Sequence, residues 1–381
     1  MGTMIYCDYN ATAPLRPEAR DAVSIALELG ANPSSVHSVG RKARSVVEKA
    51  RTQIASVIGA RGEDIVFTSG GTEANALAIN GALALIENPI ILTTDLEHPA
   101  VKANIEASGV PVRRIAVEGN GSLSLSDLSD QLNDMGDHTP FLILMLANNE
   151  TGVIQPVADA ARVVRDAGGF THCDAVQALG KLNVNAALLG VDYMAFSSHK
   201  LGGPQGAGAL WFRVGAPLKP QQLGGGQERS LRSGTENVPG IAGFGAAVSA
   251  CMSAEDAKRV SAIRDKFESL LSDVPGIRFF GREADRLPGT SNFALEGFKG
   301  ETQVMAMDLA GIAVSSGSAC SSGKVKTSDV LTAMGVEETL ANSAIRVSFG
   351  WASELKDAEA AAEAWLKAAR RAVPEAFMEK A

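Results

Sequence analysis

The sequence is poor in aromatic residues, in cysteines and in long uncharged runs, and each scarcity excludes a class of protein. Phe, Trp and Tyr make up 5% of the 381 residues, so the core has to be built from Ala, Val, Leu and Ile. The four cysteines are far apart and form no CxxC pair, which argues against a disulfide framework or a zinc site and fits a reducing cytoplasm. The longest stretch without a charge, 237–254, contains a proline and three glycines, so we expect no transmembrane helix and no membrane partner.

Basic charge is also scarce. The 35 Lys and Arg residues are outnumbered by 43 Asp and Glu residues, giving a net charge of −8. A nucleic-acid-binding protein needs a basic footprint, so we expect no direct nucleic-acid binding. The first residues lack a basic region followed by an apolar run, so we expect no secretory signal and a cytoplasmic location. No spacing of ligand-type residues predicts a metal site.

The chain divides into two parts by pattern. Helix and strand patterns alternate from about residue 15 to residue 215, which is typical of a mostly parallel sheet covered by helices. The continuous apolar run 141–147 predicts a strand buried on both faces. After about residue 250 come a charged amphipathic helix over 254–271, short strand-like pieces and an Ala-rich helix over 357–371. This mixture predicts a second, smaller α+β domain.

One motif predicts an anion site. A short strand over 65–67 precedes residues 68–73 (TSGGTE), and a helical pattern follows. The free N–H groups and the positive dipole end of a helix N-terminus favour phosphate, and Gly70 and Gly71 let the backbone approach it closely. The motif is neither a Walker loop nor a GxGxxG fingerprint, and the alternative is a capped strand-to-helix turn.

Two further residues each follow a predicted strand. Asp174 lies at a carboxyl end, where side chains face the ligand crevice of an α/β sheet, although a helix cap is the ordinary role of a lone Asp. Lys200, in SSHKLGGP, is either a solvated loop residue or a lysine in a cleft where it can act as nucleophile or base. Pyridoxal phosphate needs a phosphate site, a lysine for its aldehyde and an acid for its pyridine nitrogen. The anion loop, Lys200 and Asp174 would supply one each.

A fourth motif surrounds Cys320. Residues 313–323 (AVSSGSACSSG) contain small hydroxyl residues and glycines but no bulky apolar neighbour of the cysteine. Since cysteines are usually buried, we expect an exposed and reactive thiol, with a chance surface cysteine as the alternative. Cys7, Cys173 and Cys251 have apolar or strand-like surroundings and are expected to be structural.

Together these residues resemble the cysteine desulfurases of the NifS/IscS type, in the class V aminotransferase family of pyridoxal-phosphate enzymes of fold type I. The resemblance covers nearly the whole chain. Its motifs lie at residues 6–14, 32–37, 68–75, 97–98, 148–152, 174–177, 197–200, 224–229, 232–235, 343–346 and around Cys320. The implied fold is α/β, with a mostly parallel seven-stranded sheet in a large domain (14–256). Residues 1–13 and 257–381 would form the small α+β domain that carries the Cys320 loop.

The resemblance implies a role for each site residue. Lys200 would bind the cofactor aldehyde and then move protons, Asp174 would pair with the pyridine nitrogen, and His98 would stack on the ring. Gln177 would donate to the phenolic oxygen of the cofactor. The phosphate would be held by Gly71, Thr72, Ser197, His199 and Thr235, the last from the neighbouring subunit of a homodimer. Arg346 would take the substrate carboxylate as a bidentate pair, helped by Asn149, which also contacts the cofactor, and by Asn32. His172, on the strand that precedes Asp174, is expected to support Asp174 rather than to take part in catalysis.

The implied reaction takes sulfur from L-cysteine. The Cys320 thiolate would attack the substrate sulfur, L-alanine would leave, and the persulfide would go to an acceptor such as an iron–sulfur scaffold. The acceptor stays open between nitrogenase, housekeeping or stress assembly and tRNA thiolation. The alternatives are a selenocysteine lyase or another class V enzyme, which needs no thiol at Cys320, and a non-catalytic relay subunit, which needs neither Lys200 nor Asp174.

Overall fold

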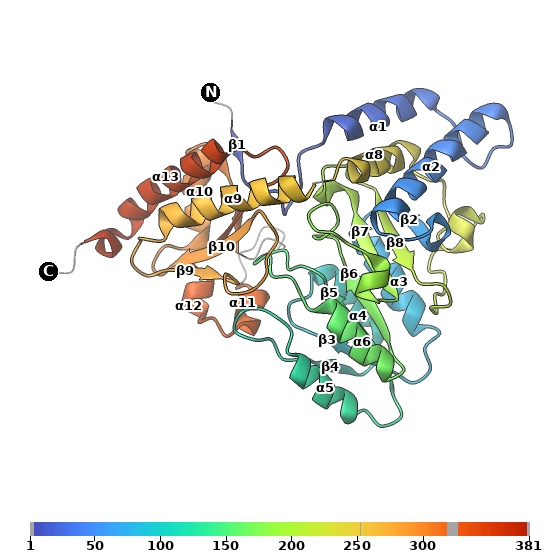
Figure 1. Cartoon of the computed structure of the whole chain (residues 1–381), viewed down its shortest axis with the longest axis horizontal. Coiled ribbons are helices and arrows are strands. Elements are labelled where there is room, and N and C mark those ends of the chain that lie inside the picture. Colours follow the sequence, from blue (N-terminus) through green and yellow to red (C-terminus); the bar gives the residue numbers. More distant parts are fainter. Residues whose placement is uncertain (1–3, 252, 318–326, 379–381) are drawn as a thin grey trace.

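The computed structural model describes residues 4–251, 253–317 and 327–378 (Figure 1). Its larger sheet has seven strands in the order β2-β8-β7-β6-β5-β3-β4, and β8 alone runs antiparallel to its neighbours. The mostly parallel sheet expected from the sequence is therefore confirmed. The strands are β2 (Ile65–Thr68), β3 (Pro89–Thr93), β4 (Val112–Arg114), β5 (Thr139–Met145), β6 (Phe170–Asp174), β7 (Tyr193–Ser197) and β8 (Gly208–Phe212).

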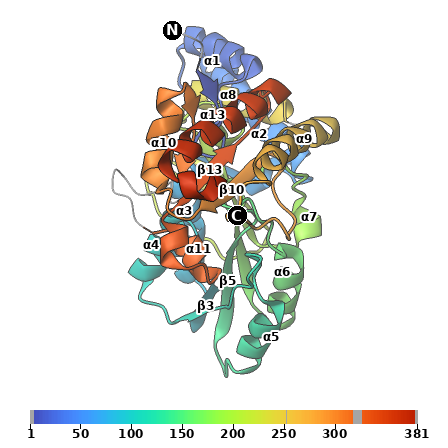
Figure 2. The same ribbon diagram turned by 90° about the vertical axis from the view of Figure 1, so that its left-hand side faces the viewer.

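Helices cover both faces of this sheet. Along β5, Leu142 and Leu144 join one apolar core, while Phe141 and Ile143 join another. This alternation explains the continuous apolar run, because successive side chains of a strand point to opposite faces. Figure 2 shows α3 and α4 on one side of the strands and α6 on the other. The helices of this part are α1 (Pro17–Leu29), α2 (Ser38–Val57), α3 (Gly71–Leu83), α4 (Pro99–Ser108), α5 (Leu125–Asn133), α6 (Val157–Asp166), α7 (Ala186–Leu189) and α8 (Val238–Ser249), with the 3-10 turns η1 (Gly62–Asp64), η2 (Ser198–Lys200) and η3 (Gln227–Ser230).

A second, smaller layer follows in the chain. An antiparallel sheet in the order β12-β13-β10-β9 packs against helices, as the expected α+β part requires. Its strands are β9 (Ile277–Phe280), β10 (Thr290–Leu295), β12 (Ser315–Ser316) and β13 (Ala344–Ser348). Its helices are α9 (Ala254–Leu271), α10 (Gly300–Leu309), α11 (Asp329–Ala333), α12 (Glu338–Ala341), α13 (Leu355–Ala372) and η4 (Pro374–Phe377).

Several aromatic rings pack against one another in this smaller core. The Phe293 ring lies 5.6 Å from that of Phe267 and 5.3 Å from that of Trp365, both edge-on. Such T-shaped pairs add to the stability given by burial. The cores of the larger sheet are mostly aliphatic but also bury the rings of Phe141, Phe196 and Phe244. The expectation of an aliphatic core therefore holds only in part.

The N-terminal segment belongs with the C-terminal elements. Strand β1 (Ile5–Tyr6) pairs in parallel with β11 (Ile312–Ala313), and Figure 1 shows it beside α13. This placement supports the expected domain division, although the boundaries at 13/14 and 256/257 stay predictions. In the described part of the chain no helix is long and apolar enough to cross a membrane.

Candidate active site

A cavity of about 310 Å³ opens where the parallel strands of the larger sheet end. Strands β6 and β7 end at it, and the rest of its wall comes from the segments after β2, β3 and β5, from the N-terminal segment and from Arg346 of β13. The carboxyl edge of an open α/β sheet is the usual ligand position, because parallel strands all end there. The cavity brings together most of the residues predicted from the sequence, namely Gly71, Thr72, His98, Asn149, Asp174, Gln177, Ser197, His199, Lys200 and Arg346.

The predicted anion site is the start of α3. The helix begins at Gly71 directly after β2, and no described side chain caps its first turn. Its first N–H groups therefore face the cavity without a helical acceptor. A Cβ added at Gly71 would lie 2.7 Å from Val176 Cγ2 and 3.3 Å from Ser197 Cβ. Glycine is thus needed for the close packing of three segments around this cradle, which suits a phosphate.

Asp174 is held rigidly at the end of β6. Its Oδ2 accepts from Asn75 Nδ2 at 2.8 Å, and its Oδ1 accepts from the Val176 N–H at 3.0 Å. The Asn75 amide is oriented in turn by His172, because Asn75 Oδ1 accepts from His172 Nε2 at 2.7 Å. Burial lowers the pKa of His172 to about 3, so the ring is neutral. His172 thus contacts Asp174 through Asn75, to which the sequence analysis gave no role, and the supporting role of His172 stays a prediction.

Lys200 ends the short turn η2 after β7. Its Nζ donates to the backbone oxygens of Asn10 and Ala11, each at 2.8 Å. The N-terminal segment therefore crosses the cavity and holds the amine at its wall. This arrangement joins residues about 190 positions apart and brings the amine to the same cavity as Asp174.

Two histidines of the cavity are neutral. His98 caps α4 by accepting the Ala100 N–H on Nδ1 at 3.1 Å, which leaves the proton on Nε2. Burial lowers the pKa of His98, and the charges of Lys200 and Lys102 act in the same direction, whereas Asp174 raises it. Burial also lowers the pKa of His199 to about 4. A neutral His98 adds no charge to the site, and its Nε2–H is available as a donor.

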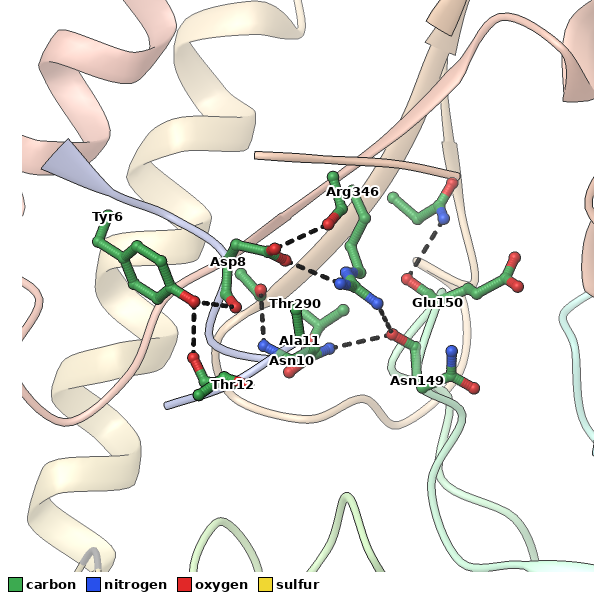
Figure 3. Close-up of polar contacts among 12 residues, drawn as sticks. Tyr6, Asp8, Asn10, Ala11, Thr12, Asn149, Glu150, Thr290 and Arg346 are labelled. Carbon is green, nitrogen blue, oxygen red and sulfur yellow. Dashed lines mark hydrogen bonds and ion pairs between the residues drawn. The ribbon is translucent and has the colours of Figure 1, made fainter. Parts of the chain in front are cut away.

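Arg346 is an almost fully buried cation with one unused donor (Figure 3). Its Nη2 donates to Asp8 Oδ1 and its Nη1 to the backbone oxygen of Asn149, both at 2.8 Å. Its Nε has no partner among the described residues. A buried donor without a partner is costly, so a ligand acceptor fits here. A carboxylate could take the Nε edge of this guanidinium, which agrees with the predicted role.

The hub of the site is a residue that the sequence analysis left without a role. Asn10 is buried, and its backbone oxygen accepts from Lys200 Nζ and from Gln177 Nε2. Its side chain binds the Asn149 oxygen, Thr290 Oγ1 and Lys181 Nζ. Asn10 lies within a motif that carried the resemblance, which was the only sign of its importance. These partners, and Ser348, which accepts from the Asn10 N–H, are 139 to 338 positions away, so spacing could not reveal them.

Three predicted residues are not part of this cavity. Asn32 is exposed, and its Oδ1 accepts the N–H of Ser34 at 2.8 Å within its own turn. Thr235 is exposed as well and lines no wall of the cavity in the single chain. Cys320 lies outside the described residues. The roles of these three residues stay predictions.

Comparison with known proteins agrees with this geometry. The family model described as Aminotransferase class-V matches residues 5–360. The chain belongs to this family. It is 43% identical over 353 residues to a cysteine desulfurase of Cereibacter sphaeroides, covering 90% of each chain. It is 40% identical to the cysteine desulfurase IscS of Dictyoglomus turgidum, covering 91% of this chain and 89% of that one.

The solved structures confirm the fold expected for this class V aminotransferase chain. A NifS-like protein from Rickettsia africae superposes with a TM-score of 0.88 at 33% identity. The match covers 96% of this chain and 99% of that structure. Both layers described above therefore belong to one known architecture.

Proposed function

We propose that this class V aminotransferase-family protein is a cysteine desulfurase that uses pyridoxal phosphate. It takes sulfur from L-cysteine and gives L-alanine and a persulfide on Cys320. The observation that carries the proposal is that Lys200, Asp174 and the unpaired edge of Arg346 line one cavity. The curated relatives that share about two fifths of the sequence are cysteine desulfurases, which supports the choice of substrate.

The cavity residues fit the cofactor by their donor set. The start of α3 at Gly71 and Thr72, with Ser197 and His199, offers N–H and side-chain donors for the phosphate. The Asp174 carboxylate suits a protonated pyridine nitrogen, and the Lys200 amine suits an aldehyde. His98 would cover the ring face. Gln177 would donate to the phenolic oxygen, and Asn149 would line the same space.

The chain's own groups would each perform one task. When bound, the cofactor would withdraw electrons from the substrate Cα, which makes its C–H bond acidic. Arg346 would hold the substrate carboxylate through Nε and so fix the Cα near the Lys200 amine, which would take up and return its proton. His98, being neutral, would hold or pass protons at Nε2 near the same cavity.

Cys320 would carry out the sulfur transfer. Its thiolate forms an S–S bond while the Cβ–S bond of the substrate breaks. The bonding pair stays on Cβ, which takes up a proton to give L-alanine, and the proton lost by the substrate thiol balances this uptake. The sulfur leaves as a persulfide on Cys320, ready for an acceptor such as an iron–sulfur scaffold. No external oxidant is consumed.

We also propose a cytoplasmic homodimer. The exposed position of Thr235 supports a contact with a neighbouring subunit, where it would reach the phosphate. Cys7, Cys173 and Cys251 are free thiols, which fits a reducing compartment. Sedimentation should give a dimer, and an active monomer would contradict a shared site.

The deciding experiment measures L-alanine and sulfide released from L-cysteine in the presence of a reductant, with the protein loaded with pyridoxal phosphate. We expect the two products in equal amounts, and neither from Lys200→Ala. An intact cofactor band without alanine would overturn the substrate while leaving the cofactor site in place. Selenocysteine, tested in parallel, distinguishes a selenocysteine lyase.

A further inference from the structure

Lys181 lies directly behind the cavity and is not needed by the reaction described above. It follows β6 in the same turn as Gln177 and is partly buried. Its Nζ donates to Gln177 Oε1 at 2.7 Å and to Asn10 Oδ1 at 2.8 Å. Both acceptors are neutral amide oxygens, and no carboxylate of the described ranges forms an ion pair with Lys181. An amine placed between two amides is an unusual use of a lysine.

The side-chain amides of Gln177 and Asn10 cannot flip by 180° without losing hydrogen bonds. Gln177 Nε2 donates to the Asn10 backbone oxygen at 2.9 Å, so a reversed Gln177 amide would face Lys181 with a donor and Asn10 with an acceptor. Asn10 Nδ2 binds the Asn149 oxygen and Thr290 Oγ1, so its Oδ1 has to face Lys181. Lys181 Nζ therefore fixes the oxygen side of both amides, while backbone oxygens of Asn10 and Asn149 fix their NH₂ sides.

We propose that Lys181 is a positioning residue that locks the Gln177 amide with its NH₂ group toward the cavity. Gln177 then presents its second N–H, which binds no described residue, to the phenolic oxygen of the cofactor. This inference rests on the proposed cofactor site and deepens it by naming a group that, with the Asn10 backbone oxygen, sets the orientation of the Gln177 amide. The same nitrogen connects, through Asn10, to the amine of Lys200.

The role does not depend on the charge of Lys181. Burial, together with the charges of Lys200 and Arg346, lowers the pKa of Lys181 well below its ordinary value. A neutral amine still has the two hydrogens that its two acceptors require. Arg16 and Tyr9 are titratable groups that line, with Lys181 and Lys200, a second hollow behind the cavity. A third titratable group, His199, directly precedes Lys200 in the sequence. None of these groups donates to the Gln177 amide.

The test follows the visible absorption of the loaded protein against pH. A donor to the phenolic oxygen favours its anionic form and lowers the pH midpoint of the spectral change. Lys181→Met removes the hydrogens that orient Gln177, so we expect the midpoint to rise by about one pH unit, or about tenfold in the proton dissociation constant. Lys181→Arg keeps a donor, so its midpoint should stay close to that of the wild type. Lys49→Met, on the exposed face of α2, is the matched control and should leave the midpoint unchanged.

A double variant separates this role from simple packing. In a Gln177→Leu background, Lys181→Met should move the midpoint little further, because the residue through which it acts is gone. An unchanged midpoint in Lys181→Met, or an equal shift in Lys181→Arg, would overturn the inference. A structural residue alone would lower the unfolding temperature without moving the midpoint. If Lys181→Met does not fold, Lys181→Leu, which also lacks a donor, takes its place.

The two proposals fail in different ways. A normal wild-type spectral midpoint without alanine from L-cysteine would refute the desulfurase activity and leave the role of Lys181 intact. Alanine release with an unmoved midpoint in Lys181→Met would refute the positioning role and leave the desulfurase activity intact.

Discussion

The carboxylate of Asp8 ties Arg346 to the strand that precedes the Cys320 segment. Arg346 Nη2 donates to Asp8 Oδ1 at 2.8 Å, although the two residues are 338 positions apart (Figure 3). The other oxygen of Asp8 accepts from Ser315 Oγ in β12, also at 2.8 Å. One carboxylate thus fixes both the predicted substrate-binding cation and the last described strand before Cys320. This relationship links substrate binding to the segment that would carry the sulfur.

Asp8→Asn should therefore weaken substrate binding. The substitution keeps an oxygen for Arg346 but replaces a charge-assisted hydrogen bond with a neutral one. The difference of about 1.4 kcal/mol corresponds to about a tenfold higher KM for L-cysteine, with a smaller change in kcat. Steady-state kinetics measure this split. Asp21→Asn, at an exposed ion pair with Arg20, should leave KM unchanged. A fall in kcat alone would contradict an orienting role for Asp8.

Gly71→Ala should weaken cofactor binding. The new methyl group would meet Val176 Cγ2 at 2.7 Å and Ser197 Cβ at 3.3 Å, so the start of α3 would have to shift. Overpacking of this kind costs about 1–3 kcal/mol, which predicts a roughly 5- to 150-fold higher Kd for pyridoxal phosphate. Fluorescence titration of the apoprotein gives that Kd. Gly119→Ala, which meets no atom within 4 Å, is the control. Equal affinities would show that Gly71 is not part of the phosphate cradle.

Much of the fold could be predicted because its signals are local. The helix predicted over 254–271 begins and ends where the pattern placed it, and the strand predicted over 65–67 is β2, one residue longer. Helix α8 escaped prediction as a helix, because it is apolar nearly all round and shows no polar face. Nine of its twelve residues are buried between the larger sheet and α1 and α2. A helix buried on all sides has no periodicity to detect.

The residues of the candidate site also separate into those that local sequence could predict and those that it could not. Residues that follow strands directly, such as Asp174 and Lys200, could be predicted, because the strand end determines where they lie. Asn75, Asn10 and Lys181 received no role, since they act through contacts with residues distant in the sequence. Their function depends on the orientation of amide groups, which no sequence pattern records.

Lys200→Ala should abolish the visible absorption band of the bound cofactor. The amine is the only group proposed to bond covalently to the aldehyde, and its loss removes two hydrogen bonds to Asn10 and Ala11. Far-UV circular dichroism should remain that of the wild type, since Lys200 adds little to the core. Lys219→Ala, at an exposed lysine, should keep the band. A normal band in Lys200→Ala would refute the assignment.

Cys320→Ala should keep the cofactor band and lose sulfide release by at least about a hundredfold, because the proposed nucleophile is gone. The described cysteines are poor substitutes. Burial raises the pKa of Cys7 to about 12 and that of Cys251 to about 11, and it raises the pKa of Cys173 well above its ordinary value. All three are thiols at neutral pH, whereas the attack needs a thiolate. Cys251→Ala should retain sulfide release, and full release by Cys320→Ala would mean another nucleophile.

The buried carboxyl of Glu97 should make the free energy of unfolding depend on pH. It is buried beside the site, with Oε1 accepting the Met145 N–H at 2.9 Å and Oε2 without a described partner. Burial raises its pKa to about 8, and the charge of Asp174 acts in the same direction. In the unfolded chain its pKa is about 4.3, so between these values only the folded protein keeps the proton. Its contribution to stability is therefore full below about pH 4 and is lost as the pH rises to 8.

Glu97→Gln should remove this dependence. The free energy of unfolding of the wild type, relative to that of the variant, should fall by about 1.4 kcal/mol per pH unit between about pH 5 and 8. Urea unfolding at several pH values measures this difference, in which the shared contributions of His98, His199 and Glu150 cancel. Glu301→Gln, at an exposed residue of α10, should run parallel to the wild type. A Glu97→Gln curve parallel to the wild type would mean that Glu97 is ionised in the folded protein.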